Sequence, residues 1–203
     1  MAMTGHPTTA AQRSRRSRIS PEREAELYDA VLDLLREVGY EGLTMEAVAT
    51  RTRCSKATLY RQWAGKPELV AKALRHQKPV SFDRIDTGSL RGDLMTLVDQ
   101  LDDHRMAEDT ALIRGLSCAV HAYPELRVAL RRLLVDPEVS GLDTLLGRAV
   151  ERGEVHPDTP ALAYVAHMMV GALITHSLIE GTPADAAFLR RYIDSALFPA
   201  LGV

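Results

Sequence analysis

The segment Cys54–Trp63, CSKATLYRQW, carries more side chains that can hold an anion than side chains that must be buried. Its lysine and arginine offer positive charge, and its threonine and tyrosine offer hydroxyl donors, which suit phosphate oxygens. An arginine can also form two hydrogen bonds with the edge of a guanine. Leu59 and Trp63 lie four residues apart and therefore on one face of a helix. We expect a short helix anchored by these two residues, with its other face free to bind DNA.

The flanking residues predict the elements that hold this helix. Ser20, Thr44 and Ser55 stand where a hydroxyl side chain caps the first turn of a helix, and Gly39 stands where a glycine ends one. Two short helices separated by a tight turn are typical of a helix-turn-helix, whose second helix enters the major groove. The helices predicted for this unit are Pro21–Val38, Thr44–Arg51, Lys56–Trp63 and Pro67–Gln77.

The same residues resemble the tetracycline-repressor (TetR) family of transcription regulators. The resemblance runs from about Glu22 to Leu74, and its strongest parts are GYEGLTMEAVA and SKATLYRQWAGKPELV. It implies that Thr44, Tyr60 and Lys66 contact phosphates and that Trp63 is a core aromatic residue. It also implies that Lys56, Ala57 and Arg61 face the bases or their rims. With two further phosphate candidates, the predicted DNA-binding residues are Thr44, Lys56, Ala57, Thr58, Tyr60, Arg61, Gln62 and Lys66.

Two residues depart from the family's pattern. Gln62 stands where the family often has His or Tyr, and Arg53 stands where a turn glycine is usual. If the turn keeps its shape, Arg53 holds a positive φ at a cost on the order of 1 kcal/mol. Alternatively, the turn is rebuilt and Arg53 itself meets DNA. The adjacent Cys54 is predicted to be a small buried residue rather than a redox sensor.

The composition separates the chain into two parts. Residues 1–78 hold 14 Lys and Arg against 9 Asp and Glu, whereas residues 79–203 hold 11 against 18. This asymmetry favours a basic front that binds nucleic acid, although charges on two solvated surfaces would give the same split. Residues 1–20 are predicted to be a disordered basic arm, either inert or tracking DNA, with arginines at Arg13, Arg15, Arg16 and Arg18. Two cysteines and no apolar N-terminal stretch favour a reducing, cytoplasmic location.

The remainder of the chain is predicted to be helical as well, with no good strand. We therefore expect an all-α protein with an N-terminal three-helix, helix-turn-helix domain and a C-terminal helical bundle for ligand binding and dimerisation. The expected domain boundaries are 21–78 for DNA binding and 79–203 for the bundle. The helices predicted for the bundle are Arg91–His104, Glu108–Ala122, Pro124–Val135, Pro137–Glu151, Pro160–Glu180 and Pro183–Leu201.

The segment Ala161–Ile179 is apolar nearly all round. It is long enough to be weighed as a membrane span. Polar residues such as His167 and His176 interrupt it, so we favour a helix buried against its own domain and against a second subunit. We expect a homodimer through residues 160–180 and 183–201, and no membrane partner. The resemblance implies the same, because the family's last two helices form a four-helix interface with their symmetry mates.

The chemistry of the bundle is less clear from its residues. We expect an apolar pocket for a small-molecule effector, although each histidine in the set could simply be a core or surface residue. Cys118 and His121 share a helix face, but a zinc site would usually have more Cys or His at short spacing. We therefore expect no metal and no cofactor. The predicted ligand-binding residues are Leu101, His104, Leu112, Leu116, His121, Tyr164, His167 and Met168.

These features together predict a DNA-binding regulator. The preferred interpretation is a homodimeric repressor, released from a palindromic site in double-stranded DNA by a hydrophobic ligand that is neutral or cationic. The alternative is a constitutive, architectural DNA-binding protein without an effector. A third class, an enzyme that uses the front domain only to dimerise, is disfavoured because the sequence contains no catalytic motif.

Overall fold

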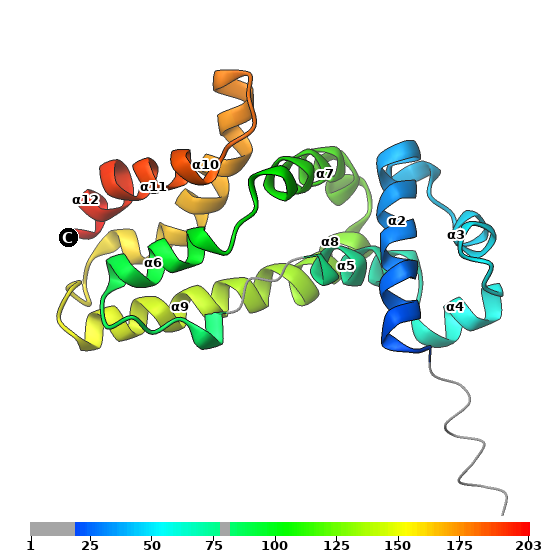
Figure 1. The fold of residues 1–203 in the computed structure, drawn as a ribbon, viewed down its shortest axis with the longest axis horizontal. Helices are drawn as coiled ribbons and strands as arrows, with labels where there is room; N and C mark the ends of the chain where they lie inside the picture. Colours follow the sequence, from blue (N-terminus) through cyan, green and yellow to red (C-terminus); the bar gives the residue numbers. More distant parts are fainter. Residues whose placement is uncertain (1–18, 78–81) are drawn as a thin grey trace, which may run out of the picture.

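The computed structural model describes residues 19–77 and 82–203, without the side chains of residues 83, 104–106, 109–111, 113 and 114. The described residues are helical throughout and contain no strand, which confirms the predicted fold class. Most of the predicted basic arm, residues 1–18, lies outside the described residues. The molecule is elongated, with the predicted helix-turn-helix at one end and its C-terminus at the other (Figure 1).

We call the first four helices the head. They are α2 (Pro21–Gly42), α3 (Met45–Thr52), α4 (Lys56–Gln62) and α5 (Lys66–His76). The hydroxyls of Ser20, Thr44 and Ser55 each accept a hydrogen bond from the backbone of the following turn, as predicted for N-caps. Gly39 has φ 69° and ψ 178°, so helical geometry breaks there as predicted, although the chain stays coiled as far as Gly42. Only glycine adopts this conformation readily.

Buried apolar residues hold the head together. Leu59 and Trp63 are buried, as predicted, and the Trp63 ring lies edge-on to Tyr28 with centroids 5.9 Å apart. The Trp63 indole N–H donates a hydrogen bond to the Tyr28 hydroxyl at 3.3 Å, which satisfies the one polar atom of the buried ring. The same core also includes Leu116 and Leu126, which belong to helices that follow the head. The head therefore packs firmly against the rest of the chain.

We call the remaining elements the rear. The chain turns through η2 (Phe82–Arg84), a 3₁₀ turn, and then forms a layered helical body that encloses a second core (Figure 1). Its elements are α6 (Leu90–Asp99), α7 (Asp103–Ala122), α8 (Pro124–Leu130), η3 (Arg131–Val135), α9 (Asp136–Glu151), η4 (Pro160–Tyr164), α10 (Val165–Glu180), α11 (Ala186–Tyr192), η5 (Ile193–Leu197) and α12 (Phe198–Leu201).

Several predicted helix limits are wrong. The helix predicted to reach His104 ends at Asp99, because the chain turns at Gln100 and α7 already begins at Asp103. The two helices predicted around Pro137 form one continuous rod, because the wider π turn η3 precedes the proline. The first residues of the predicted helix Pro160–Glu180 form a 3₁₀ turn, and the last helix begins at Ala186 behind its N-cap Asp185.

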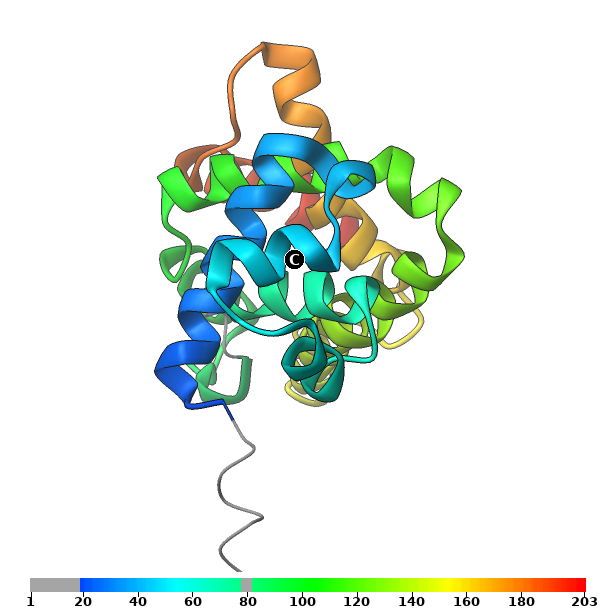
Figure 2. The same ribbon diagram turned by 90° about the vertical axis from the view of Figure 1, so that its right-hand side faces the viewer.

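The helix α10 stands apart from the other elements. It projects beyond its neighbours in two perpendicular views (Figures 1 and 2), and its residues Leu178 and Ile179 are 82% and 74% exposed. Within the described residues, Pro160–Glu180 is the helix long and apolar enough to cross a membrane by length and composition alone, and 11% of its most apolar window is buried. A large apolar surface exposed to water is typical of a site that contacts another protein or a membrane.

Candidate nucleic-acid interface

The helix α4 is held in place by its buried face, and its opposite face is exposed. Leu59 lies in the core beneath it, and Ser55 caps it by accepting a hydrogen bond from the Thr58 N–H at 3.1 Å. The opposite face is exposed at Lys56, Ala57 and Arg61, and Tyr60 is 52% exposed. One buried face and one exposed face are what the sequence predicts for this helix. The helices α3 and α4 also lie at the outer end of the molecule, where a duplex could approach (Figure 2).

The polar side chains on and beside this face differ in whether they already form hydrogen bonds within the protein. Arg61 forms no hydrogen bond or ion pair with any other residue of the described part of the chain. The Thr58 hydroxyl lies 2.9 Å from the Ser55 hydroxyl inside the cap, and Gln62 is half-buried. The Thr44 hydroxyl caps α3 by accepting a hydrogen bond from the Ala47 N–H at 3.1 Å. Arg61 is therefore the most available donor for a base edge.

Lys56 is held in an ion pair across the helix-turn-helix. Its ammonium donates to the carboxylate of Glu46 on α3. This hydrogen bond raises the pKa of Lys56 and lowers the pKa of Glu46, and both side chains are exposed. The sequence did not reveal this contact, because the two residues are ten positions apart on different helices. DNA that binds here must either break the pair or use Lys56 in the position that Glu46 gives it.

Lys66 occupies a cage rather than open solvent. Its ammonium donates to the backbone carbonyl of Tyr40 at 2.8 Å and lies 4.1 Å from the centre of the Tyr40 ring. The Tyr123 ring, at 5.8 Å, forms another wall. Partial burial lowers the pKa of Lys66. The residue implied to be a phosphate contact therefore also joins the head to the start of α8.

Arg53 keeps the backbone conformation of the family's turn glycine. Its φ of 53° and ψ of 34° lie in the left-handed region, and it is the non-glycine residue with positive φ in the described part of the chain. The next residue, Cys54, donates its backbone N–H to the Ala49 carbonyl at 3.0 Å. Cys54 is half-buried against the head core. The turn therefore keeps its shape, which is the first of the two alternatives.

The predicted ligand-binding residues lie in different parts of the described structure. Leu112 and Leu116 lie in the core shared with the head, whereas Leu101 and Met168 pack against the second core. The side chain of His104 lies outside the described residues. The other three face outward: Tyr164 and His167 are exposed on the α10 side, and His121 is exposed with its Nδ1 2.8 Å from the Ser117 carbonyl. The predicted set is therefore divided between two cores and the exposed surface.

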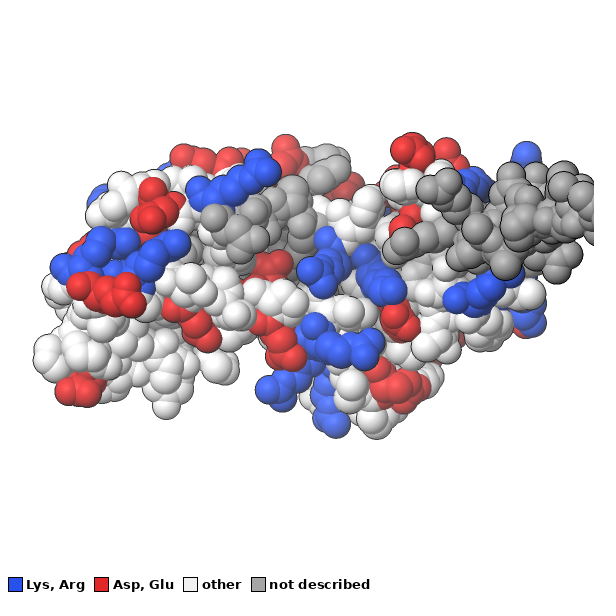
Figure 3. Space-filling view, turned by 90° about the horizontal axis from the view of Figure 1, so that it is seen from below, with Lys and Arg blue, Asp and Glu red and all other residues white. Residues whose placement is uncertain are grey.

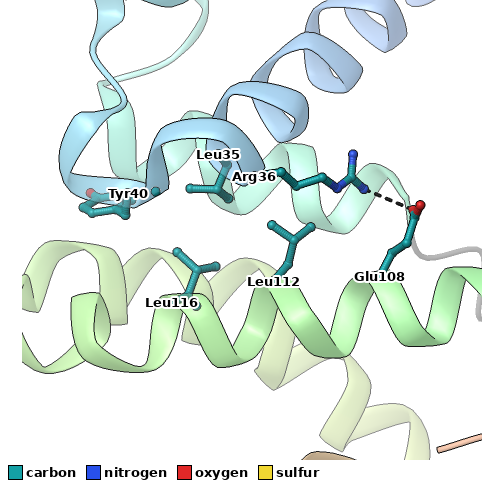
Figure 4. Close-up of a pocket in the computed structure, with 8 residues that line it drawn as sticks. Leu35, Arg36, Tyr40, Glu108, Leu112 and Leu116 are labelled. Carbon is teal, nitrogen blue, oxygen red and sulfur yellow. Dashed lines mark hydrogen bonds and ion pairs between the residues drawn. The ribbon is translucent and has the colours of Figure 1, made fainter. Parts of the chain in front are cut away.

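The structure instead hollows out the contact between α2 and α7. A cavity of about 410 Å³ lies there, and Figure 4 shows side chains from the two helices facing each other across it. Sequence reasoning found two of its residues and missed the others, because no local pattern tells that α2 pairs with α7. The lining residues are Leu35, Arg36, Gly39, Tyr40, Glu108, Leu112, Gly115 and Leu116.

The distribution of charged and metal-binding side chains bears on which part of the surface could be a functional site. Basic and acidic side chains both lie on the face drawn in Figure 3, and several basic ones gather near its middle, so this face is not one continuous acidic surface. Among the described residues, no group of three or more His, Cys, Asp or Glu side chains is placed to hold a metal ion. The exposed face of α4 is thus the site whose chemistry is most clearly defined, and that chemistry suits DNA.

Comparison with known proteins agrees with this geometry. The family model "Bacterial regulatory proteins, tetR family" matches residues 27–73, and the model "Tetracyclin repressor-like, C-terminal domain" matches residues 84–196. The chain is 36% identical over 176 residues to a DNA-binding transcriptional repressor TetR of Mycobacteroides abscessus, covering 86% of this chain and 92% of that protein.

Two further similarities span nearly the whole chain. An uncharacterized HTH-type transcriptional regulator of Mycobacterium tuberculosis is 32% identical over 200 residues, covering 98% of each chain. The crystal structure of the TetR family transcription regulator SCO0332 superimposes with a TM-score of 0.65 at 29% identity, covering 90% of this chain and 98% of that one. Both the head and the rear are therefore shared with these regulators.

Proposed function

The chain belongs to the TetR family of DNA-binding transcription regulators, and on that premise we propose that it is a homodimeric repressor released from its operator by a small molecule. Regulators of this family bind DNA as dimers and respond to small-molecule ligands, and they are not enzymes. The observation that carries the proposal is the recognition helix α4, anchored by Leu59 and Trp63 with its charged face exposed. Its relatives are bacterial regulators, and we place its action in the cytoplasm.

We call the exposed face of α4, with Lys56, Ala57, Tyr60 and Arg61, the reading face, and the roles proposed for it and its neighbours follow from their exposure. Arg61 is assigned to base edges because it is exposed and unpaired among the described residues. Lys56 and Ala57 lie beside it, with Lys56 positioned by Glu46. The hydroxyls of Thr44 and Tyr60 are assigned to phosphates, with Thr58 and Gln62 as weaker candidates because they are half-buried. Lys66 reaches a phosphate only if its ammonium leaves the carbonyl of Tyr40.

The dimer is proposed to form through α10 and the run from α11 to α12. Leu178 and Ile179 lie on the exposed half of α10, and burying each such side chain contributes about 1.5–3 kcal/mol. The two-fold symmetry of such a dimer matches a palindromic DNA site. This interface also accounts for the apolar length of α10 without a membrane.

Two measurements test the proposal. The first selects bound duplexes from random DNA, and we expect enrichment of a palindromic or near-palindromic sequence. The second is sedimentation velocity at micromolar concentration, where the wild-type chain should be a dimer. Leu178→Lys should shift it towards monomer, whereas Val128→Lys should not, because Val128 is an exposed residue on α8, away from α10. A wild-type monomer would refute the dimer, and a selection without an enriched sequence would refute the operator.

A further inference from the structure

The cavity between α2 and α7 has an apolar interior and a polar end. Leu35 and Tyr40 from α2 face Leu112 and Leu116 from α7, as Figure 4 shows. At one end the guanidinium of Arg36 pairs with the carboxylate of Glu108 at 3.3 Å, which links the two helices. We propose that this cavity is the effector site, and that its ligand is a neutral, largely apolar small molecule. This proposal rests on the proposed function and places its ligand at the joint between head and rear.

Two of the residues that line the cavity are exposed glycines, Gly39 and Gly115. A Cβ added at Gly39 or at Gly115 would meet no atom within 4 Å, so the volume above each is open. Gly39 needs its positive φ, but Gly115 lies within α7 and no left-handed conformation requires a glycine there. Glycine inside a helix costs up to about 1 kcal/mol relative to alanine. A side chain at Gly115 would enter the cavity that this residue lines, and the cavity's volume of about 410 Å³ is within the range of small-molecule pockets.

The described charges at the polar end of the cavity favour a neutral ligand over an anionic one. Arg36 lies 3.0 Å from Asp33 as well as 3.3 Å from Glu108, so one guanidinium stands beside two carboxylates. An anionic ligand would gain little from this cation and would be repelled by both acids. A neutral molecule can bury its apolar part between the leucines and place one hydrogen-bonding group beside the ion pair.

The position of the cavity gives its occupant a route to the reading face. Tyr40 lines the cavity, and its backbone carbonyl and ring both hold the ammonium of Lys66. Lys66 is the first residue of α5, three positions after Trp63 at the end of α4. A ligand that moves α2 away from α7 therefore displaces Tyr40 and, through Lys66, the turn between α4 and α5. This turn sets the angle of α4. Ligand and DNA would then weaken each other's binding by the same factor.

The first test measures binding of Nile red, a neutral apolar dye that fluoresces in apolar sites. We expect saturable binding to the wild-type protein. Gly115→Leu should weaken this binding by about tenfold or more, because the added side chain fills the cavity. Gly147→Leu is the matched control, since Gly147 is also an exposed helical glycine with open space around it, on α9. The control should change dye affinity by less than about twofold.

The second test adds DNA, using the sequence enriched by selection. Nile red should lower the DNA affinity of the wild type and of Gly147→Leu by about fivefold or more, and should leave Gly115→Leu unaffected. No dye binding, or equal binding to all three proteins, would overturn the site. Loss of dye binding in Gly115→Leu without any effect of the dye on wild-type DNA affinity would overturn the coupling. The selection of DNA sequences contains no dye. If it enriches no sequence, the proposed function fails, independently of the cavity.

Discussion

Arg53 offers a direct measurement of the strain held in the turn before the recognition helix. Its left-handed conformation, φ 53° and ψ 34°, costs an L-residue with a Cβ about 1–2 kcal/mol. Glycine adopts this conformation without that cost but makes the unfolded chain more flexible, which offsets about 0.4–1 kcal/mol. Arg53→Gly should therefore stabilise the protein by about 0.5–1 kcal/mol, or raise the Tm by roughly 1–4 °C at this chain length.

Arg53→Ala is the matched control, because alanine removes the exposed side chain and keeps the Cβ that causes the strain. Urea unfolding of both variants at one fixed protein concentration separates the two effects, since the stability of a dimer depends on concentration. Arg53→Ala should lie within about 0.5 kcal/mol of wild type. If Arg53→Gly is no more stable than Arg53→Ala, the turn is not strained and the reasoning is wrong. Equal DNA affinity of wild type and Arg53→Ala would show that the side chain makes no DNA contact.

Two further predictions concern a buried acid and the reading face. Asp93 has no exposed surface; burial tends to raise its pKa, but hydrogen bonds from the Thr87 N–H and hydroxyl, at 2.6 and 2.8 Å, and the nearby Arg152 outweigh this and lower it. The stabilisation by the ionised Asp93 is therefore fully present above the unfolded pKa of about 3.9 and is lost as the pH falls through the lower folded pKa. Asp93→Ala should lower the free energy of unfolding, measured in urea at pH 7, by about 3 kcal/mol. A variant as stable as the wild type would contradict the buried network. In binding assays on a panel of DNA sequences, Tyr60→Phe and Lys66→Ala should weaken all complexes alike, whereas Arg61→Ala should change which bases are preferred; the reverse pattern would refute the assigned roles.

The sequence was sufficient for the local features of the head. Ser20, Thr44 and Ser55 act through atoms only three residues away, so helix starts could be predicted from single hydroxyls. The positive φ of Arg53 was one of two alternatives, and it was raised only because the resembled family usually has a glycine at this position. Trp63 was predicted to be buried because it and Leu59 share one face.

Contacts between distant segments could not be predicted in the same way. Periodicity places Leu112 and Leu116 on a buried face of α7, but it does not say that the opposing helix is α2 rather than α10. Lys66 resembles a phosphate contact in sequence, and only the tertiary approach of Tyr40 and Tyr123 places its ammonium in a cage. The pairing of Lys56 with Glu46 depends on the angle between two helices, which no local spacing determines.

The continuous rod formed by α8, η3 and α9 connects the two cores of the molecule. Leu126 and Leu134 near its start belong to the head core, and Leu145 and Leu146 belong to the second core. From Pro124 to Glu151 the rod is roughly 40 Å long at 1.5 Å per residue. Tilting such a lever by about 5° moves its far end by roughly 3–4 Å, an appreciable part of a groove's width. The π turn at Arg131–Val135 contains Leu134, the last residue of the rod in the head core, so the rod would bend where it leaves that core.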